Sequence, residues 1–275
     1  MKPRLTGVLL FAAALAAAMP IRFSVAAEES ADTNQDAELA KKLQNPVAAL
    51  ISLPFKLDYD AGIGPANADR FALVVQPVIP ISLNEDWNVI SRTIVPFIHA
   101  GSPVEGGGSL GGTGDILQSF FFSPMAPTAG GWIWGAGPAV SVPSASKDAL
   151  GSEKWSVGPT LVVLKQGGGW TYGMLANHLW SIGGNSDRAD VSATLLQPFV
   201  SYTTNSFTTC GLNTESTYDW KAQQWTVPIN LTVSQLLKIG RQPMSFLLGL
   251  RGYAQRPSGG PDWGLRFQWT LLFPR

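Results

Sequence analysis

Two histidines, His99 and His178, are the residues best suited to act as a general base in this chain of 275 residues. A serine hydrolase needs a histidine within hydrogen-bond reach of the serine, and a third group that orients the ring. Asn177, His178 and Ser181 fall on one expected strand, but adjacent strand residues face opposite sides, so Asn177 cannot readily orient His178. His99 has Ser102 nearby in an expected loop. A lipid hydrolase at the rim of the fold is therefore the weakest of the functions that we weigh.

Metal and cofactor chemistry have little support in the sequence. Two histidines and the single cysteine, Cys210, offer no recognised metal-ligand spacing and no internal disulfide. The glycine-rich segment 106–114 resembles a phosphate loop only in composition, because it lacks the lysine and the following helix. We expect no cofactor and no metal, and we interpret Cys210 as a small apolar residue on a strand.

The composition favours many strands over long helices. Charged residues make up 14% of the chain, against about 25% in ordinary soluble domains. The sequence nevertheless lacks the long apolar runs of helical membrane proteins. Its 29 glycines and 20 prolines argue for strands joined by turns.

Residues 1–27 have the features of a secretory signal peptide. Lys2 and Arg4 precede an uncharged run from Leu5 to Met19, which is too short to span a membrane as a helix. Val25-Ala26-Ala27 then offers small residues for cleavage, so we expect the mature chain to begin near Glu28. An uncleaved membrane anchor is the alternative.

Cleavage leaves a weakly acidic chain. The signal contains Lys2, Arg4 and Arg22 and no acid, so the mature chain keeps 16 basic and 19 acidic residues, a net charge of about −3. This balance provides no basic excess for binding nucleic acid.

Residues 28–45 differ from the rest of the mature chain. Residues 28–35 are polar, whereas residues 37–43 could form two helical turns before Pro46 stops the helix. This segment could be a small plug or a periplasmic contact. A frayed N-terminal tail is an equally good interpretation.

From Pro46 onward the side chains alternate with a period of two. Side chains on a strand point alternately to opposite faces, so each alternating segment has one apolar face and one mixed or polar face. Twelve such segments can be marked: 46–59, 69–83, 87–99, 115–123, 132–143, 155–165, 170–181, 191–202, 207–218, 225–237, 243–254 and 263–273.

These segments have the length of membrane-spanning strands. A tilted strand needs about 9 to 11 residues to cross a bilayer, while strands of soluble proteins usually have about 5 or 6. Short and long connections alternate, as in outer-membrane barrels, with 124–131 as the exception. Tryptophans at the strand ends are typical of aromatic girdles: Trp87, Trp132, Trp155, Trp170, Trp180, Trp225 and Trp263.

The sequence therefore predicts an all-β protein, an antiparallel transmembrane β-barrel of about 12 strands over residues 46–275. A soluble barrel with aromatic residues packed at its ends is the alternative. Prolines inside the expected strands count against a closed ladder, because each removes a hydrogen-bond donor and should mark a bulge or bend. They are Pro54, Pro77, Pro138, Pro159 and Pro198.

Charged residues within the expected strands should face the lumen, since an arginine at the midplane of the lipid face costs about 2 to 4 kcal/mol. Basic residues outnumber acids in this set, which favours anionic or polar solutes if the pore is open. The alternative is a hydrogen-bonded plug of side chains that fills a narrow barrel. The candidate lumen residues are Lys56, Arg70, Gln76, Arg92, Glu215, Asn230, Arg251 and Arg266.

The last segment resembles an outer-membrane assembly signal. Asp262, Gly264, Phe267 and Trp269 give a polar residue, a glycine and two alternating aromatic residues near the C-terminus. We expect this strand to present its aromatic side chains to lipid, its glycine to let it bend, and the barrel assembly machinery to recognise it.

Several stretches resemble a family of bacterial exported proteins that carry the labels "neuromedin U" or "transporter". The stretches are Leu43-Gln44-Asn45-Pro46-Val47, Gln76-Pro77-Val78-Ile79-Pro80, Asn84-Glu85-Asp86-Trp87-Asn88, Ser119-Phe120-Phe121-Phe122-Ser123-Pro124, Leu212-Asn213-Thr214-Glu215-Ser216-Thr217-Tyr218 and Trp263-Gly264-Leu265-Arg266-Phe267. Gly114-Asp115 and Val142-Pro143 are similar to outer-membrane proteins associated with aromatic-compound degradation, such as those of the phenol meta-pathway. The resemblance implies a barrel and suggests transport. It supplies no substrate and no functional residues.

The sequence thus predicts a porin-like outer-membrane barrel of a Gram-negative bacterium, which passes small molecules passively. Its expected partners are outer-membrane lipid, the assembly machinery and an unidentified small solute. A non-conducting barrel with a structural or surface-interaction role is the main alternative, and a rim hydrolase is the weaker one. We expect no enzyme activity.

Overall fold

A computed structural model describes residues 31–274. The barrel belongs to the compact unit that begins at Gln35. The expected signal peptide, residues 1–27, and its cleavage site lie outside the described residues. Among the described residues, no helix is both long and apolar enough to cross a membrane.

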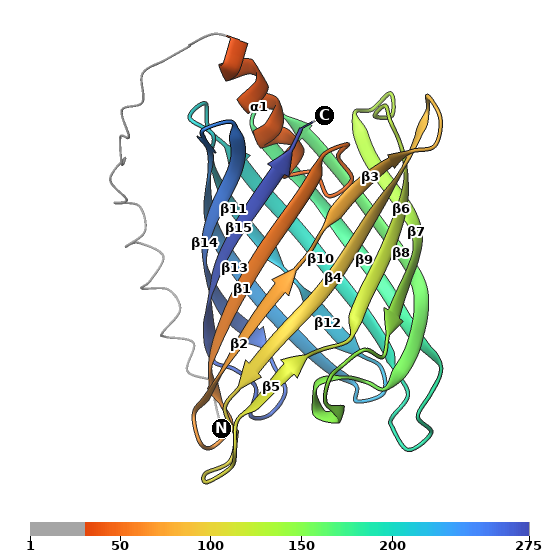
Figure 1. The fold of residues 1–275 in the computed structure, drawn as a ribbon, viewed down its shortest axis with the longest axis vertical. Coiled ribbons are helices and arrows are strands. Elements are labelled where there is room, and N and C mark those ends of the chain that lie inside the picture. The colour runs from red at the N-terminus through yellow and green to blue at the C-terminus, as the bar shows by residue number, and fades with distance from the viewer. Residues whose placement is uncertain (1–30, 275) are drawn as a thin grey trace. The chain divides into compact units, whose positions relative to one another are not determined.

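Residues 51–273 form one antiparallel sheet that closes on itself (Figure 1). The first strand, β1, pairs with the last, β15, along eleven residues from Ile51–Phe273 to Ala61–Trp263. Three of the strands are interrupted, and they appear as the consecutive pairs β2 and β3, β5 and β6, and β11 and β12. The prediction of a closed antiparallel barrel of 12 strands with a short N-terminal helix is confirmed. The elements are α1 (Ala31–Leu43), β1 (Ile51–Ile63), β2 (Ala68–Val75), β3 (Val78–Ser82), β4 (Trp87–Ala100), β5 (Leu110–Thr113), β6 (Ile116–Pro124), β7 (Trp132–Val142), η2 (Asp148–Leu150), β8 (Lys154–Gly167), β9 (Trp170–Gly184), β10 (Ser192–Thr203), β11 (Thr208–Thr214), β12 (Ser216–Asp219), β13 (Gln224–Ile239), β14 (Gln242–Gln255) and β15 (Trp263–Phe273).

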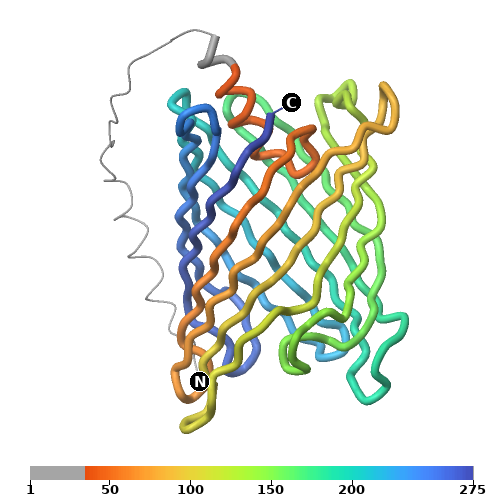
Figure 2. The backbone as a smooth tube through the Cα atoms, in the orientation of Figure 1, coloured from red at the N-terminus to blue at the C-terminus, as the bar shows by residue number. Residues whose placement is uncertain are grey.

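The two ends of the barrel differ in their connections (Figure 2). We call the end that holds α1 and the last strand's terminus the helix rim, and the opposite end the loop rim. The predicted alternation of short turns and long loops is present in part, because the loop-rim connections 64–67 and 220–223 are as short as 83–86 and 204–207 at the helix rim. The segment 125–131 is the longest connection at the helix rim. The helix rim has connections 83–86, 125–131, 168–169, 204–207 and 240–241, and the loop rim has 64–67, 101–109, 143–153, 185–191, 220–223 and 256–262.

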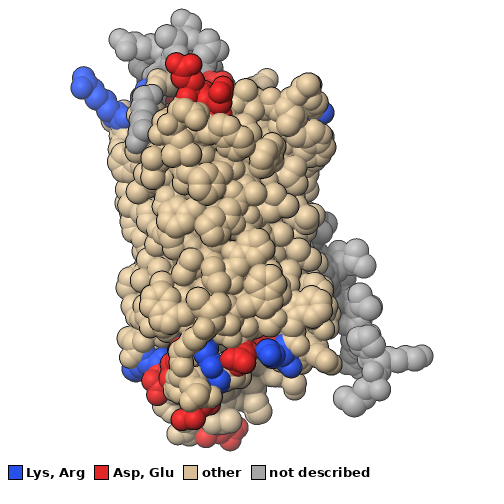
Figure 3. Space-filling view, turned by 90° about the vertical axis from the view of Figure 1, so that its right-hand side faces the viewer, with Lys and Arg blue, Asp and Glu red and all other residues tan. Residues whose placement is uncertain are grey.

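The outer face of the barrel is apolar. Large hydrophobic side chains such as Leu161, Leu248 and Phe267 are exposed along the middle of their strands. On the face drawn in Figure 3, the acidic and basic side chains gather at the two ends and leave an uncharged belt between them. Five tryptophans of the predicted girdles are exposed near the rims: Trp132, Trp155, Trp170, Trp180 and Trp263.

Prolines disturb the ladder less than the sequence suggested. Pro77 separates β2 from β3, and Pro198 of β10 lies opposite the break between β11 and β12, so the predicted disturbance occurs at each of these. Pro54, Pro138 and Pro159 remain within continuous strands and produce no register shift. The pairing of β7 with β6 is interrupted at Pro138, and that of β8 with β9 at Pro159, so the ladder is broken there without a bulge. Pro138 and Pro159 face each other across β7 and β8.

Gly264 lies at the seam where β15 meets β1. A Cβ atom at this position would collide with the backbone carbonyl of Tyr59 on β1. The glycine of the C-terminal signal therefore permits a close approach of the two strands that close the barrel.

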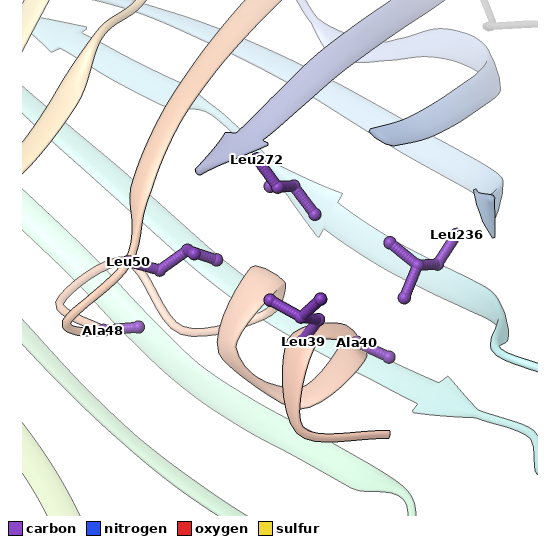
Figure 4. Close-up of a cluster of buried hydrophobic side chains, with 6 residues drawn as sticks. All are labelled: Leu39, Ala40, Ala48, Leu50, Leu236 and Leu272. Carbon is purple, nitrogen blue, oxygen red and sulfur yellow. The ribbon is translucent and has the colours of Figure 1, made fainter. Parts of the chain in front are cut away.

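The N-terminal segment enters the barrel at the helix rim. The prediction that the first strand begins at Pro46 is wrong, because residues 46–50 form turns and β1 begins at Ile51. Leu39 and Ala40 of α1 instead pack with Ala48 and Leu50 against inward-facing side chains of β13 and β15 (Figure 4). The two barrel residues in this cluster are Leu236 and Leu272.

A second buried apolar cluster lies on the inner face of the opposite wall. Val47 of the N-terminal segment packs there with Ile90, Phe121, Leu164 and Leu175. Val47 therefore faces the interior, although the alternation predicted it on the outer face of a strand. Interior packing by residues 39–50 fills part of the barrel near the helix rim.

Candidate functional site

Ion pairs link the strands across the interior of the barrel. Asp58 of β1 lies directly opposite Arg266 of β15 and accepts hydrogen bonds from its Nε and Nη2 atoms at 2.7 and 3.0 Å. Arg266 Nη2 also donates to Glu215 Oε2 at 2.8 Å. Lys56 Nζ lies 3.3 Å from Glu215 Oε1. One carboxylate from β1 and one from the β11–β12 junction thus share the same cations.

The position of Glu215 shows that these contacts cross the lumen. Three strands, β13, β14 and β15, lie between the β11–β12 junction and β1 in the sheet order. Lys56 on β1 and Glu215 could not touch across the outer surface of a closed wall. Both side chains therefore point inward, as does Arg266, which bridges them.

Arg251 of β14 joins a third carboxylate, Asp60, to the network. Its Nη2 and Nη1 atoms lie 3.0 Å from Asp58 Oδ2 and 3.3 Å from Asp60 Oδ1. Its Nε donates to Asn230 Oδ1 at 2.8 Å, and Asn230 donates in turn to Asn213. Arg251, Asp60 and Asn230 are buried, so these hydrogen bonds satisfy groups that water does not reach.

Asp60 has two further partners. The Tyr253 hydroxyl donates to Asp60 Oδ1 at 2.5 Å, and Arg70 Nη2 lies 2.8 Å from Asp60 Oδ2. Asp60 is fully buried, whereas the Arg70 side chain is 43% exposed. Arg70 therefore extends the network from the interior toward the loop rim.

The structure brings six of the eight candidate lumen residues into this network and sets the other two apart. Gln76 and Arg92 form a separate pair in which Arg92 Nη2 donates to Gln76 Oε1 at 3.2 Å. The six members of the network are Lys56, Arg70, Glu215, Asn230, Arg251 and Arg266. That these side chains line a route for solute stays a prediction.

Four of the ten residues in the network are absent from the predicted set. Asp58, Asp60, Tyr253 and Asn213 were not among the candidates, although Asp58 and Asp60 share the inward face of Lys56 at every second residue. With Asp58 and Asp60 included, three carboxylates face four cations in the network. The predicted basic excess is therefore largely compensated there, as the alternative of a side-chain plug anticipated.

A cavity of about 200 Å³ lies between the network and the N-terminal segment. Residues 42–50 line one side of it, and inward-facing residues of β1, β4, β10 and β15 line the other. Gln76 and Arg92 belong to this cavity, together with Gln197 and Gln268. The polar wall of the cavity thus consists of amides, the hydroxyl residues Ser52 and Thr270, and the cations Arg92 and Lys42.

The candidate hydrolase residues have a different arrangement from a catalytic triad. His178 Nδ1 lies 2.7 Å from the hydroxyl of Thr194, and the imidazole packs against Trp180 with ring centroids 4.1 Å apart. Ser181 donates to Asp190 instead. His178 therefore has a threonine and an aromatic neighbour, and this geometry gives the rim hydrolase no support.

The loop rim carries a small exposed cluster around Asp190. Lys154 and Ser181 donate to its carboxylate, and these hydrogen bonds lower the pKa of Asp190 from its ordinary value. Within residues 31–274, no group of three or more histidine, cysteine or acidic side chains could hold a metal ion. Cys210 is an exposed residue of β11.

Comparison with known proteins identifies related barrels. No protein-family model matches the sequence, and no curated protein matches it. The COG4313 outer membrane channel from Pseudomonas putida F1 superposes with a TM-score of 0.64 at 13% identity, over 82% of this chain and 96% of that chain. At this identity the likeness is one of fold.

Two other solved barrels are less similar. The β domain of the Bordetella autotransporter BrkA has a TM-score of 0.47 at 10% identity, over 82% of this chain and all of that chain (100%). Outer membrane phospholipase A from Escherichia coli has a TM-score of 0.46 at 10% identity, over 81% of this chain and 92% of that chain. The finer resemblance to the exported "neuromedin U" family stays a prediction.

Proposed function

We propose that this chain is an outer-membrane channel that passes small molecules passively through its lumen. The observation that carries the proposal is the contrast between the two faces of the closed wall. The outer face is an uncharged apolar belt, and the inner face holds charged and amide side chains around a cavity. Such a wall suits a barrel that contacts lipid outside and polar solute inside.

The likeness in fold to a COG4313 outer membrane channel supports the same function. The proposal includes export by a cleaved signal at residues 1–27, assembly through the outer-membrane machinery and insertion into outer-membrane lipid. Residues 39–50 then act as a partial plug at the helix rim, because they pack inside the barrel rather than outside it.

Planar-bilayer recording tests this proposal. The protein beginning at residue 28 is compared with a variant that lacks residues 28–43, and heat-modifiable migration confirms that both barrels are folded. We expect discrete conductance steps from the first protein and larger steps from the variant, since the deletion removes α1 from the mouth. If neither folded barrel passes ions, the chain is no channel.

A non-conducting barrel remains the second candidate, and the ion-pair network favours it. The network joins β1, β14, β15 and the β11–β12 junction by hydrogen bonds that cross the lumen. Charged groups held in this way can serve to fill and stiffen a narrow barrel. This candidate predicts no solute flux with or without α1.

A further inference from the structure

Arg92 of β4 is half-buried, and it differs from the other cations of the barrel interior. Lys56, Arg251 and Arg266 each lie within 4.0 Å of a carboxylate oxygen. Among residues 31–274, Arg92 has no such ion pair, and its one side-chain hydrogen bond is that from Nη2 to Gln76. Its buried Nε atom has no hydrogen-bond partner.

Burial without a counter-charge is costly for a guanidinium. A buried ion without a partner destabilises a protein, and an unpaired buried donor adds a further cost. Glu215 is the carboxylate that acts on Arg92 from a distance, but its oxygens are held by Lys56 and Arg266. The described residues therefore leave Arg92 without a counter-charge of its own.

The surroundings of Arg92 form a cavity that could hold such a partner. The cavity has a volume of about 200 Å³. Gln197 and Gln268 line it with amide groups, and the Gln197 side chain has no hydrogen-bond partner among residues 31–274. Lys42 borders the cavity too, but its ammonium lies 3.5 Å from Glu38. Arg92 is thus the unpaired cation of this site.

Apolar side chains line the cavity beside these polar groups. Leu175 of β9 lies directly opposite Gln197, Val78 of β3 lies opposite Arg92, and Leu43, Leu50 and Phe199 complete the apolar part of the wall. An inorganic anion has no apolar group that could pack against these side chains. An engineered cavity of about 150 Å³ with apolar walls binds benzene, so the present volume suits a body of about six carbons with a small charged head.

We propose that this cavity binds a small organic monocarboxylate, with its carboxylate on Arg92 and the amides and its apolar body against Leu175 and Phe199. The inference names the solute class of the proposed channel and so rests on that function. A guanidinium can donate two parallel hydrogen bonds to a carboxylate, which suits the free donors of Arg92.

Equilibrium dialysis of radiolabelled hexanoate against the purified barrel in detergent tests the site. We expect saturable binding of one hexanoate per chain at neutral pH. Arg92→Gln keeps a polar side chain, although a shorter one, and removes the charge, and it should weaken binding about tenfold or more. Arg70→Gln is the matched control, because Arg70 is also an inward arginine but pairs with Asp60 and does not line the cavity; it should bind hexanoate as the unchanged chain does.

Two further ligands test the unchanged chain, so the result does not depend on the folding of a variant. Hexanamide has the same body without the charge and should bind at least about tenfold more weakly. Inorganic phosphate, which has the charge without the body, should fail to displace hexanoate at equal concentration. Equal binding of hexanoate and hexanamide, displacement by phosphate, or no saturable hexanoate binding would each overturn the inference.

Conductance in potassium chloride separates this inference from the proposed function. If the barrel conducts ions but does not bind hexanoate, the proposed channel function stands and the proposed carboxylate site is rejected. If the barrel binds hexanoate but conducts no ions, the proposed carboxylate site stands and the proposed channel function is rejected.

Discussion

Asp58 holds two arginines in the interior of the barrel at the same time. Its two oxygens accept hydrogen bonds from Arg266 at 2.7 and 3.0 Å, and Arg251 donates to the same carboxylate at 3.0 Å. All three side chains are less than a tenth exposed. Replacing such a set by apolar residues can be neutral, but removing one member leaves the others charged and unpaired.

Asp58→Asn should therefore destabilise the barrel strongly. The neutral amide leaves Arg251 and Arg266 short of counter-charge, and loss of one partner from a buried ion pair costs about 3 to 5 kcal/mol. Urea unfolding followed by tryptophan fluorescence measures the change in the free energy of unfolding. Asp187→Asn in an exposed loop is the matched control, for which we expect a change within about 0.5 kcal/mol. Equal stability of the two variants would show that the ion-pair network does not contribute this much to the free energy of unfolding.

The sequence predicts which charged side chains face the interior of the barrel, but it does not predict which of them form ion pairs with one another. Lys56, Arg251 and Arg266 were found because a charge within a membrane strand has to face inward. Asp60 was assigned to a loop, because the apolar alternation fades before the strand ends. Glu215 and Arg92 were both found, yet no sequence signal shows that the first is paired and the second is not. That distinction depends on which strands lie across the lumen from each other.

The N-terminal segment, residues 39–50, packs inside the barrel at the helix rim. Leu39, Ala40, Ala48 and Leu50 are buried against inward side chains of β13 and β15, and the Gln166 side chain donates to the backbone carbonyl of Lys41 at 2.9 Å. The Ser201 hydroxyl of β10 also donates to Gln44 Oε1 at 3.3 Å, so apolar contacts and two hydrogen bonds hold residues 39–50 in the mouth at the helix rim. The plug that the sequence offered as one of two interpretations fits this packing.

Leu39→Asp should release the segment from the mouth. Loss of a buried leucine alone costs about 2 to 5 kcal/mol, and a carboxylate among Leu50, Leu236 and Leu272 adds the cost of burying a charge. We expect a higher single-channel conductance than that of the unchanged chain in the same bilayer. Glu38→Gln, an exposed change on the same helix, should leave the conductance unaltered. A Leu39→Asp barrel with unaltered conductance would mean that the segment does not obstruct the lumen.

The start of the first strand shows where periodicity fails as a guide. Residues 46–50 continue the alternation of β1, so no signal in the sequence separates them from that strand. The structure uses their apolar side chains for packing inside the barrel, and Val47 and Leu50 both become buried. Alternation reports which residues are apolar, but it does not distinguish a lipid-facing strand from a chain that packs within the lumen.

At the scale of the whole molecule, the barrel reverses the usual arrangement of a globular protein. Its polar groups are concentrated inside, in the network and around the cavity, and its large apolar side chains are outside. The sequence predicted this arrangement because alternation over 9 or more residues, strand-end tryptophans and low charge all favour the same architecture. Stacked sheets with a shared apolar core are excluded by the pairing of β1 with β15.

The lipid contact of the outer belt is the central claim, and spin-label accessibility tests it most directly. The native Cys210 is replaced by serine, and a nitroxide is attached to a cysteine at Leu248, which is 67% exposed in the middle of β14, or at Val104 in a loop at the loop rim. In liposomes, we expect the label at position 248 to collide with oxygen and to be shielded from a water-soluble nickel complex, and the label at position 104 to show the reverse. Access of the nickel complex to position 248 in the folded, liposome-bound barrel would contradict the account.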